Sequence, residues 1–199
     1  MKIVEIELSP DFVQQVAYLY RDMENAYDGA AKDLNFSCTG CPDNCCDSFF
    51  QHHTYTEWTY LWLGLKTLDS TQQQTIHAKA TRYVVETESA LARGERPIMM
   101  CPLNEDELCT LYPYRMMLCR LHGVPATLTR PDGKKLEFPG CFRCQELTPA
   151  ESPTRTLDRT RFLQRLVDLE IRLLGSRRMT APKVKLTIAQ MIVKGPPRL

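Results

Sequence analysis

Residues 38–46 read Cys38-Thr39-Gly40-Cys41-Pro42-Asp43-Asn44-Cys45-Cys46 and place four thiols within nine residues. The Gly, Pro, Asn and Asp residues between the cysteines favour a loop over a helix or a strand. Thiols this close together are difficult to keep reduced and unreactive unless something binds them. The stretch therefore predicts one half of a metal site, in a loop whose shape the metal would set.

The other half is expected among the five later cysteines, which are Cys101, Cys109, Cys119, Cys141 and Cys144. Thiolate ligation brings sulfurs within about 2.3 Å of a shared ion, which cysteines two residues apart can achieve. The pairs Cys38–Cys41 and Cys141–Cys144 have that spacing. The adjacent side chains of Cys45 and Cys46 tend to diverge, which indicates two neighbouring centres, or one cluster with a thiol held back. Any single cysteine could instead be an inert core residue.

Composition predicts one globular domain over residues 1–199, because 43% of the residues are hydrophobic and 25% are charged. The formal charge of +1 gives no general attraction to nucleic acid or to a membrane. Residues 1–7 contain acids where a signal peptide needs a continuous apolar core. No apolar run reaches the roughly 18 residues of a membrane span, so we expect a cytoplasmic protein. In that reducing compartment, and with an odd number of cysteines, metal binding is favoured over disulfides.

Three helices are predicted before residue 95. The first begins at Ser9-Pro10-Asp11 and ends between Tyr27 and Lys32, the second spans about 55 to 68 behind a capping box at Thr54 and Glu57, and the third begins at Asp69-Ser70 and closes near Gly94. Six prolines leave room only for short elements between 97 and 145. One β-hairpin is predicted there, at 127–138, around Asp132-Gly133.

A further helix is predicted from Ser152-Pro153 to Gly175. The tail after it favours either a short strand at 184–188 or a helical turn at 188–192. The fold class that follows is a helix-rich α+β domain, in which helices frame an irregular cysteine-ligated metal subdomain with one β-hairpin. The cysteine-rich region spans 36–145, and the C-terminal helical segment spans 152–199.

A second motif lies downstream of the first loop. Cys101-Pro102-Leu103 is followed by Cys109-Thr110-Leu111-Tyr112-Pro113-Tyr114-Arg115-Met116-Met117-Leu118-Cys119-Arg120. With residues 38–46, this pattern resembles the CxxCxxCC (YkgJ-type) cysteine-cluster family, which is described as zinc- or iron-chelating and often as iron–sulfur. The resemblance covers 36–145, with two departures: three residues separate Cys41 from Cys45, and Met116 stands where the family usually has proline.

The resemblance implies about eight ligand cysteines in a chain that has nine. On that basis the ligands are expected to be Cys38, Cys41, Cys45, Cys46, Cys101, Cys109 and Cys119, with either Cys141 or Cys144 as the eighth and the other as the spare. Four cysteines suit a [4Fe-4S] cluster and a tetrahedral zinc site equally well. Only His122 is placed like a histidine ligand, and the family description favours iron–sulfur.

Arg115 and Arg120 bracket Cys119 and are the candidate cofactor-binding residues. Positive charge beside an anionic thiolate cluster would stabilise it and raise its potential. Alternatively, Arg115 pairs with an acid such as Asp106 or Glu107. Both interpretations are open at this point.

Three classes of function agree with these motifs. The first is a redox or cluster-dependent protein that carries one or two [4Fe-4S] clusters and acts with a redox or substrate protein partner. The second is a structural zinc-binding interaction module, and the third is a metal storage or delivery protein. A flagellin lysine methylase has a similar cysteine cluster, but motif analogy does not transfer chemistry, so an enzymatic role is left open. The segment 154–185 holds nine basic and three acidic residues, and a solvated face explains it better than nucleic-acid binding does.

Overall fold

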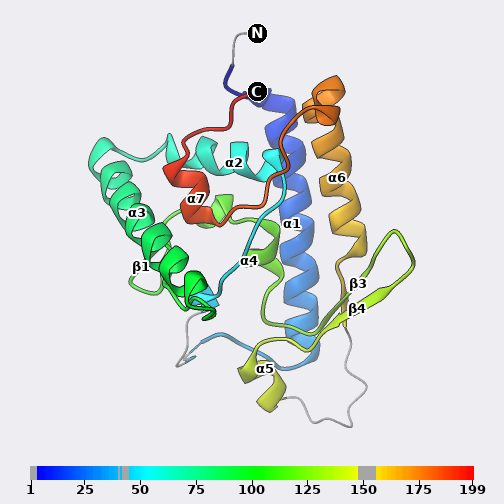
Figure 1. Cartoon of the computed structure of the whole chain (residues 1–199). Helices are drawn as coiled ribbons and strands as arrows, with labels where there is room; N and C mark the ends of the chain where they lie inside the picture. Colours follow the sequence, from blue (N-terminus) through cyan, green and yellow to red (C-terminus); the bar gives the residue numbers. More distant parts are fainter. Residues whose placement is uncertain (1–3, 40, 42–44, 148–155) are drawn as a thin grey trace.

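The computed structural model describes residues 4–39, 41, 45–147 and 156–199 (Figure 1). Helix accounts for 55% of the described residues, and the sheets are small, so the helix-rich α+β class is confirmed. Four long helices build the frame: α1 (Pro10–Asp33), α2 (Tyr55–Leu65), α3 (Ser70–Ala92) and α6 (Thr160–Leu174). The first three begin and end close to the positions that the sequence predicts.

Helix α1 is the central element, and α6 packs alongside it (Figure 1). Its N-terminus is capped by the Ser9 hydroxyl, which accepts a hydrogen bond from the Phe12 backbone N–H at 3.3 Å. One face of α1 buries Val16, Leu19 and Met23 completely, as the helical spacing of these apolar residues requires. The C-terminal half of α1 carries Tyr27, whose hydroxyl lies near the cysteines.

Helix α7 (Ile188–Val193) packs against α3 and is hydrogen-bonded to α2. The indole N–H groups of Trp58 and Trp62 both donate to the Met191 carbonyl at 3.1 Å, which fixes α7 against α2. The tail therefore forms the helical turn of the two alternatives. Leu186 contributes only an isolated bridge to His52. At the start of α2 the Thr54 hydroxyl caps Glu57 N–H at 3.2 Å, but the Glu57 carboxylate accepts from Thr54 instead of closing the predicted capping box.

The region between 97 and 145 consists of short elements, as its prolines predict. In order they are β1 (Asn104–Glu105), β2 (Leu108–Cys109), the 3-10 turn η2 (Tyr112–Tyr114), α4 (Met117–Leu121), β3 (Ala126–Thr129), β4 (Lys135–Phe138) and α5 (Phe142–Leu147). Strands β3 and β4 form the predicted hairpin. The expectation of a single hairpin was wrong, because β1 and β2 form a second antiparallel pair. Asp106 and Glu107 close it in left-handed conformations, with φ of 47° and 67°.

The C-terminal segment begins differently from its prediction. Ser152 and Pro153, the expected helix start, lie outside the described residues. The next described residues form β5 (Leu157–Asp158), which pairs in parallel with β3, so α6 begins only at Thr160. The Asp158 carboxylate accepts a hydrogen bond from Thr160 N–H at 2.9 Å and so marks the change from strand to helix. Helix α6 ends at Gly175, as predicted, and the 3-10 turn η3 (Gly175–Met179) follows.

The buried side chains form two clusters. The first lies between α1, α4, β3 and α6, and the second lies between α2, α3, α7 and residues 103–116. The partly buried Tyr114 and Leu173 pack against both. None of the helices in the described residues has the length and apolar character needed to cross a membrane.

Candidate metal centre

Four cysteines from three segments lie near one another, three of them packed against the second cluster, and we call Cys46, Cys101, Cys109 and Cys119 the inner group. Cys46 lies in the 3-10 turn η1 (Cys45–Asp47), and its carbonyl accepts from Cys101 N–H at 2.9 Å. Strand β2 positions Cys109, and α4 positions Cys119. The thiols of Cys101 and Cys119 each interact electrostatically with those of Cys46 and Cys109. The fold thus brings together thiols that are up to 73 positions apart in the sequence.

Burial has a strong effect on the ionisation of these thiols. It raises the pKa of Cys101 and Cys109 and raises that of Cys119 to about 12. A hydrogen bond from the Cys45 thiol, partly opposed by burial, lowers the pKa of Cys46 to about 6, and Asn104 and Arg115 also lower it. One thiolate is therefore stabilised within a group whose other members are held neutral. A metal ion bound here would have to displace their protons.

Two buried polar donors, from Asn104 and Arg115, face the inner group. The Arg115 Nε is buried without a hydrogen-bond partner among the described residues, whereas the Asn104 side chain acts on the Cys46 thiol as a hydrogen-bond donor. Both side chains act on Cys46 and lower its pKa. A buried donor without an acceptor costs about 1–3 kcal/mol. Thiolate or sulfide sulfurs of a bound cluster would accept from such donors, so the residues present fit an anionic iron–sulfur group.

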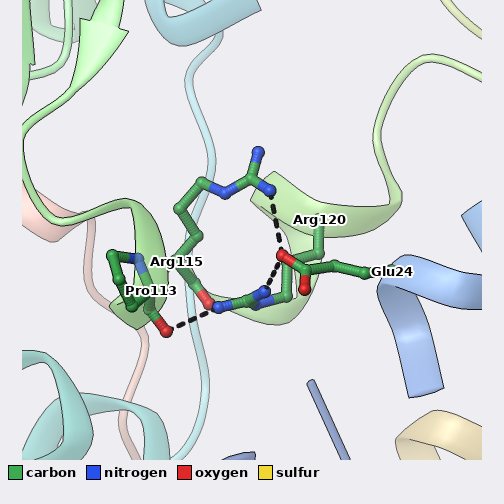
Figure 2. Close-up of polar contacts among 4 residues, drawn as sticks. All are labelled: Glu24, Pro113, Arg115 and Arg120. Atoms are coloured by element: carbon green, nitrogen blue, oxygen red, sulfur yellow. Dashed lines mark hydrogen bonds and ion pairs between the residues drawn. The ribbon is translucent and has the colours of Figure 1, made fainter. Parts of the chain in front are cut away.

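Arg115 and Arg120 meet on Glu24, which reaches them from α1 (Figure 2). Arg115 Nη2 lies 3.3 Å from Glu24 Oε1, and Arg120 Nη1 donates to the same oxygen. Arg115 therefore does pair with an acid, which is Glu24 and not one of the suggested residues Asp106 and Glu107. Both arginines also lower the pKa of Cys109. With one carboxylate between two guanidinium groups, net positive charge remains beside the thiols.

A second set of cysteines lies at the C-terminal end of α1, and we call Cys38, Cys41, Cys45 and Cys141 the Tyr27 group. The Tyr27 hydroxyl is 3.8 Å from Cys38 Sγ and interacts electrostatically with Cys141 and Cys45. Cys144 differs from these four, because it is fully buried within the first core cluster. The nine candidate cysteines therefore divide into two neighbouring groups and one core residue.

The thiols are neighbours but do not form an assembled site. All nine cysteines, each of which is described, are free of disulfides. Within the described residues, no three His, Cys, Asp or Glu side chains form a group that could hold an ion. The cysteine-ligated subdomain is thus not an observed feature, and ligation would require the thiols to close further around a metal.

Three residues near the cysteines were missed by reasoning from the sequence: Glu24, Tyr27 and Asn104. Glu24 and Tyr27 are three positions apart on α1, a spacing that puts both on one face of a helix. Nothing local connects that face to cysteines far along the chain. His122, in contrast, was a candidate ligand, and its ring packs edge-on against Phe50 with centroids 5.1 Å apart.

Comparisons with protein-family models, curated proteins and solved structures found no match to this chain. The resemblance to the CxxCxxCC family therefore rests on the cysteine motifs alone.

Proposed function

We propose that this protein binds metal through cysteine thiolates and that the inner group holds an iron–sulfur cluster with a redox or cluster-dependent role. The observation that supports it is the meeting of four thiols from three separate segments beside two arginines. Such an arrangement is costly without a ligand, because one thiolate is buried without a bound cation and the buried Arg115 Nε has no acceptor among the described residues. A cluster with bound thiolates would remove both costs.

The donors around the inner group favour iron–sulfur over zinc. Hydrogen bonds to cluster sulfurs and nearby positive charge tune the potential of an iron–sulfur centre. Arg115 and Asn104 offer N–H groups, and the Arg115–Glu24–Arg120 arrangement leaves positive charge. Structural zinc is the second candidate, since four thiolates also complete a closed tetrahedral site.

Anaerobic purification followed by visible spectroscopy and assays of iron, acid-labile sulfide and zinc tests this proposal. We expect a coloured protein with iron and sulfide in similar amounts, and loss of most of that iron in Cys119→Ser because the cluster loses a ligand. The matched control is Cys144→Ala, which removes a buried thiol outside both groups and should keep its iron. A colourless protein with bound zinc would support the structural alternative. A protein that holds no metal under any of these conditions would overturn the proposal.

A further inference from the structure

The Tyr27 group contains a hydroxyl that lies close to several of its thiols. Tyr27 extends from the last turns of α1, with its hydroxyl 3.8 Å from Cys38 Sγ. The same hydroxyl interacts with the thiols of Cys141 and Cys45. A phenol can donate one hydrogen bond, and a thiolate bound to metal is a good acceptor for it. Tyr27 thus lies among three thiols that come from two distant segments.

Backbone contacts hold the two segments of this group in place. Cys41 N–H donates to the Cys38 carbonyl at 3.1 Å, so the Cys-x-x-Cys pair begins a closed turn. Arg143 of α5 donates to the Thr39 carbonyl at 3.0 Å and connects that turn to the segment of Cys141. Cys141 N–H in turn donates to the Gly123 carbonyl at 2.9 Å. The thiols are therefore brought together by contacts other than their own.

Gly123 makes room for the tyrosine. Its φ is +116°, and a Cβ at this position would lie 2.9 Å from the Tyr27 hydroxyl oxygen. No side chain larger than hydrogen fits without moving the phenol. A glycine in a left-handed conformation here leaves the hydroxyl free to approach the sulfurs.

The Tyr27 group also belongs to a different part of the molecule from the inner group. Cys141 packs against the first core cluster, whereas Cys101, Cys109 and Cys119 pack against the second. Cys45 lies between the two groups, because its thiol donates to Cys46 and interacts electrostatically with Cys119 of the inner group as well as with Cys38. Two thiols on consecutive residues serve two neighbouring centres more readily than one ion.

We propose that Cys38, Cys41, Cys45 and Cys141 form a second metal centre, separate from the inner group, with the Tyr27 hydroxyl donating to one of its thiolates and Cys144 left in the core as a non-ligand. This inference rests on the proposed function, since it assumes that thiolates of this chain bind metal. It assigns four cysteines to the inner group, four to the Tyr27 group and Cys144 to the core. It also predicts that each chain binds two metal ions and not one.

The test is a titration of the reduced, metal-free full chain with Zn²⁺ alone, followed by native mass spectrometry. We expect about two zinc ions in the unaltered protein, since each tetrahedral thiolate site takes one. The double variants Cys38→Ser/Cys141→Ser and Cys109→Ser/Cys119→Ser should each keep about one, and Cys144→Ala should keep about two. Far-UV circular dichroism of each variant checks that the helices remain.

The outcomes separate the two proposals. If the unaltered protein binds one ion and Cys38→Ser/Cys141→Ser keeps it, the second centre is wrong while the proposed metal binding stands. If either double variant loses all zinc while keeping its helices, the cysteines form a single shared centre and the inference is overturned. If the unaltered protein binds no metal, the proposed function fails first.

Tyr27→Phe provides an independent readout because it keeps all nine thiols. With Co²⁺ as the probe, thiolate-to-cobalt absorption reports on each centre separately, and the part lost in Cys38→Ser/Cys141→Ser belongs to the Tyr27 group. We expect Tyr27→Phe to keep about two cobalt ions but to shift that part of the spectrum, since one thiolate loses its donor. An unchanged spectrum would show that the hydroxyl does not contact a ligand.

Discussion

At the scale of single residues, Arg120 makes several buried contacts within the cysteine region. Its side chain is only 2% exposed, and its guanidinium donates to the carbonyls of Pro113 and Arg115 at 2.7 Å each, as well as to Glu24. The same group lies over the Tyr20 ring, 4.4 Å from its centroid. Arg120 thus connects α1 to the segment that carries Cys109 and Cys119. Its N–H groups already donate to protein acceptors, so its main role is in the fold and not in binding a cofactor.

Arg120→Ala should lower the free energy of unfolding by about 3 kcal/mol, because it leaves two carbonyls and one carboxylate without their buried cation. The matched control is Arg82→Ala, since Arg82 pairs with Glu86 on the exposed surface of α3 with its side chain 79% exposed. That change should have no measurable effect. Urea denaturation of both metal-free variants measures the difference. Equal losses would contradict the structural role of Arg120.

For single residues, the sequence identifies the candidate functional side chains but not the distant residues that contact them. Arg115 and Arg120 are recognisable because they flank a cysteine in a short motif. Glu24 is not, because it lies 91 and 96 positions away from them and looks like any acid on a helix. For the same reason the sequence names nine candidate thiols but cannot group them, since Cys46 and Cys101 become neighbours only through a long-range backbone contact. That about eight of the nine are ligands stays a prediction, and the burial of Cys144 in the first core cluster makes it the candidate for the spare.

Among the elements, α6 contacts the N-terminus of α2 through the carboxylate of Glu170. Glu170 accepts from the backbone N–H groups of Tyr55 and Thr56 at 2.8 Å and from the Thr56 hydroxyl at 2.7 Å. These N–H groups belong to the first turn of α2, where the helix dipole favours negative charge. A side chain from one helix thereby caps another, 115 positions away at Tyr55.

Glu170→Ala should destabilise the protein by about 2 kcal/mol, because three charge-assisted hydrogen bonds are lost at a helix N-terminus. Glu170→Gln should have a smaller effect, since the amide oxygen still accepts while the charge is gone. Asp168→Ala, on the exposed face of the same helix, is the control and should change little. Thermal unfolding followed by circular dichroism measures all three. A loss with Asp168→Ala as large as with Glu170→Ala would show that the capping contact contributes nothing specific.

Local signals account for the elements that the sequence predicts well. Periodic apolar residues and caps at Ser9, Thr54 and Asp69 define α1, α2 and α3, and Asp132-Gly133 defines the β3–β4 hairpin. Elements that depend on distant pairing are missed. Leu157 and Asp158 become a strand only because β3 lies beside them. The two-residue strands β1 and β2 are too short to show alternation.

For the whole molecule, the contact between residue 52 and the C-terminal segment links the loop after the first cysteines to α7. His52 and Leu186 exchange backbone hydrogen bonds of 2.7 and 3.1 Å. The His52 ring is 2% exposed, and neither ring nitrogen has a hydrogen-bond partner among the described residues. Burial, reinforced by the neighbouring His53, lowers the pKa of His52 from 6.5 to about 3. The ring is therefore neutral in the folded protein and must become charged or exposed in acid.

This shift predicts a specific acid sensitivity of the whole fold. Between pH 6.5 and about 3 the unfolded chain binds a proton at His52 that the folded protein does not, so stability falls as the pH falls. The slope from this one group is about 1.4 kcal/mol for each pH unit within that window. His52→Leu removes the group and should flatten this part of the curve, without loss of stability at pH 7.5, because the buried ring has no hydrogen bonds to lose. Exposed His77 on α3 supplies the control, His77→Leu, which should leave the curve unchanged. Urea unfolding of the metal-free proteins at intervals from pH 7.5 to 4.5 measures the three curves. If His52→Leu keeps the full acid slope, His52 does not remain neutral in the core and another group accounts for the acid sensitivity.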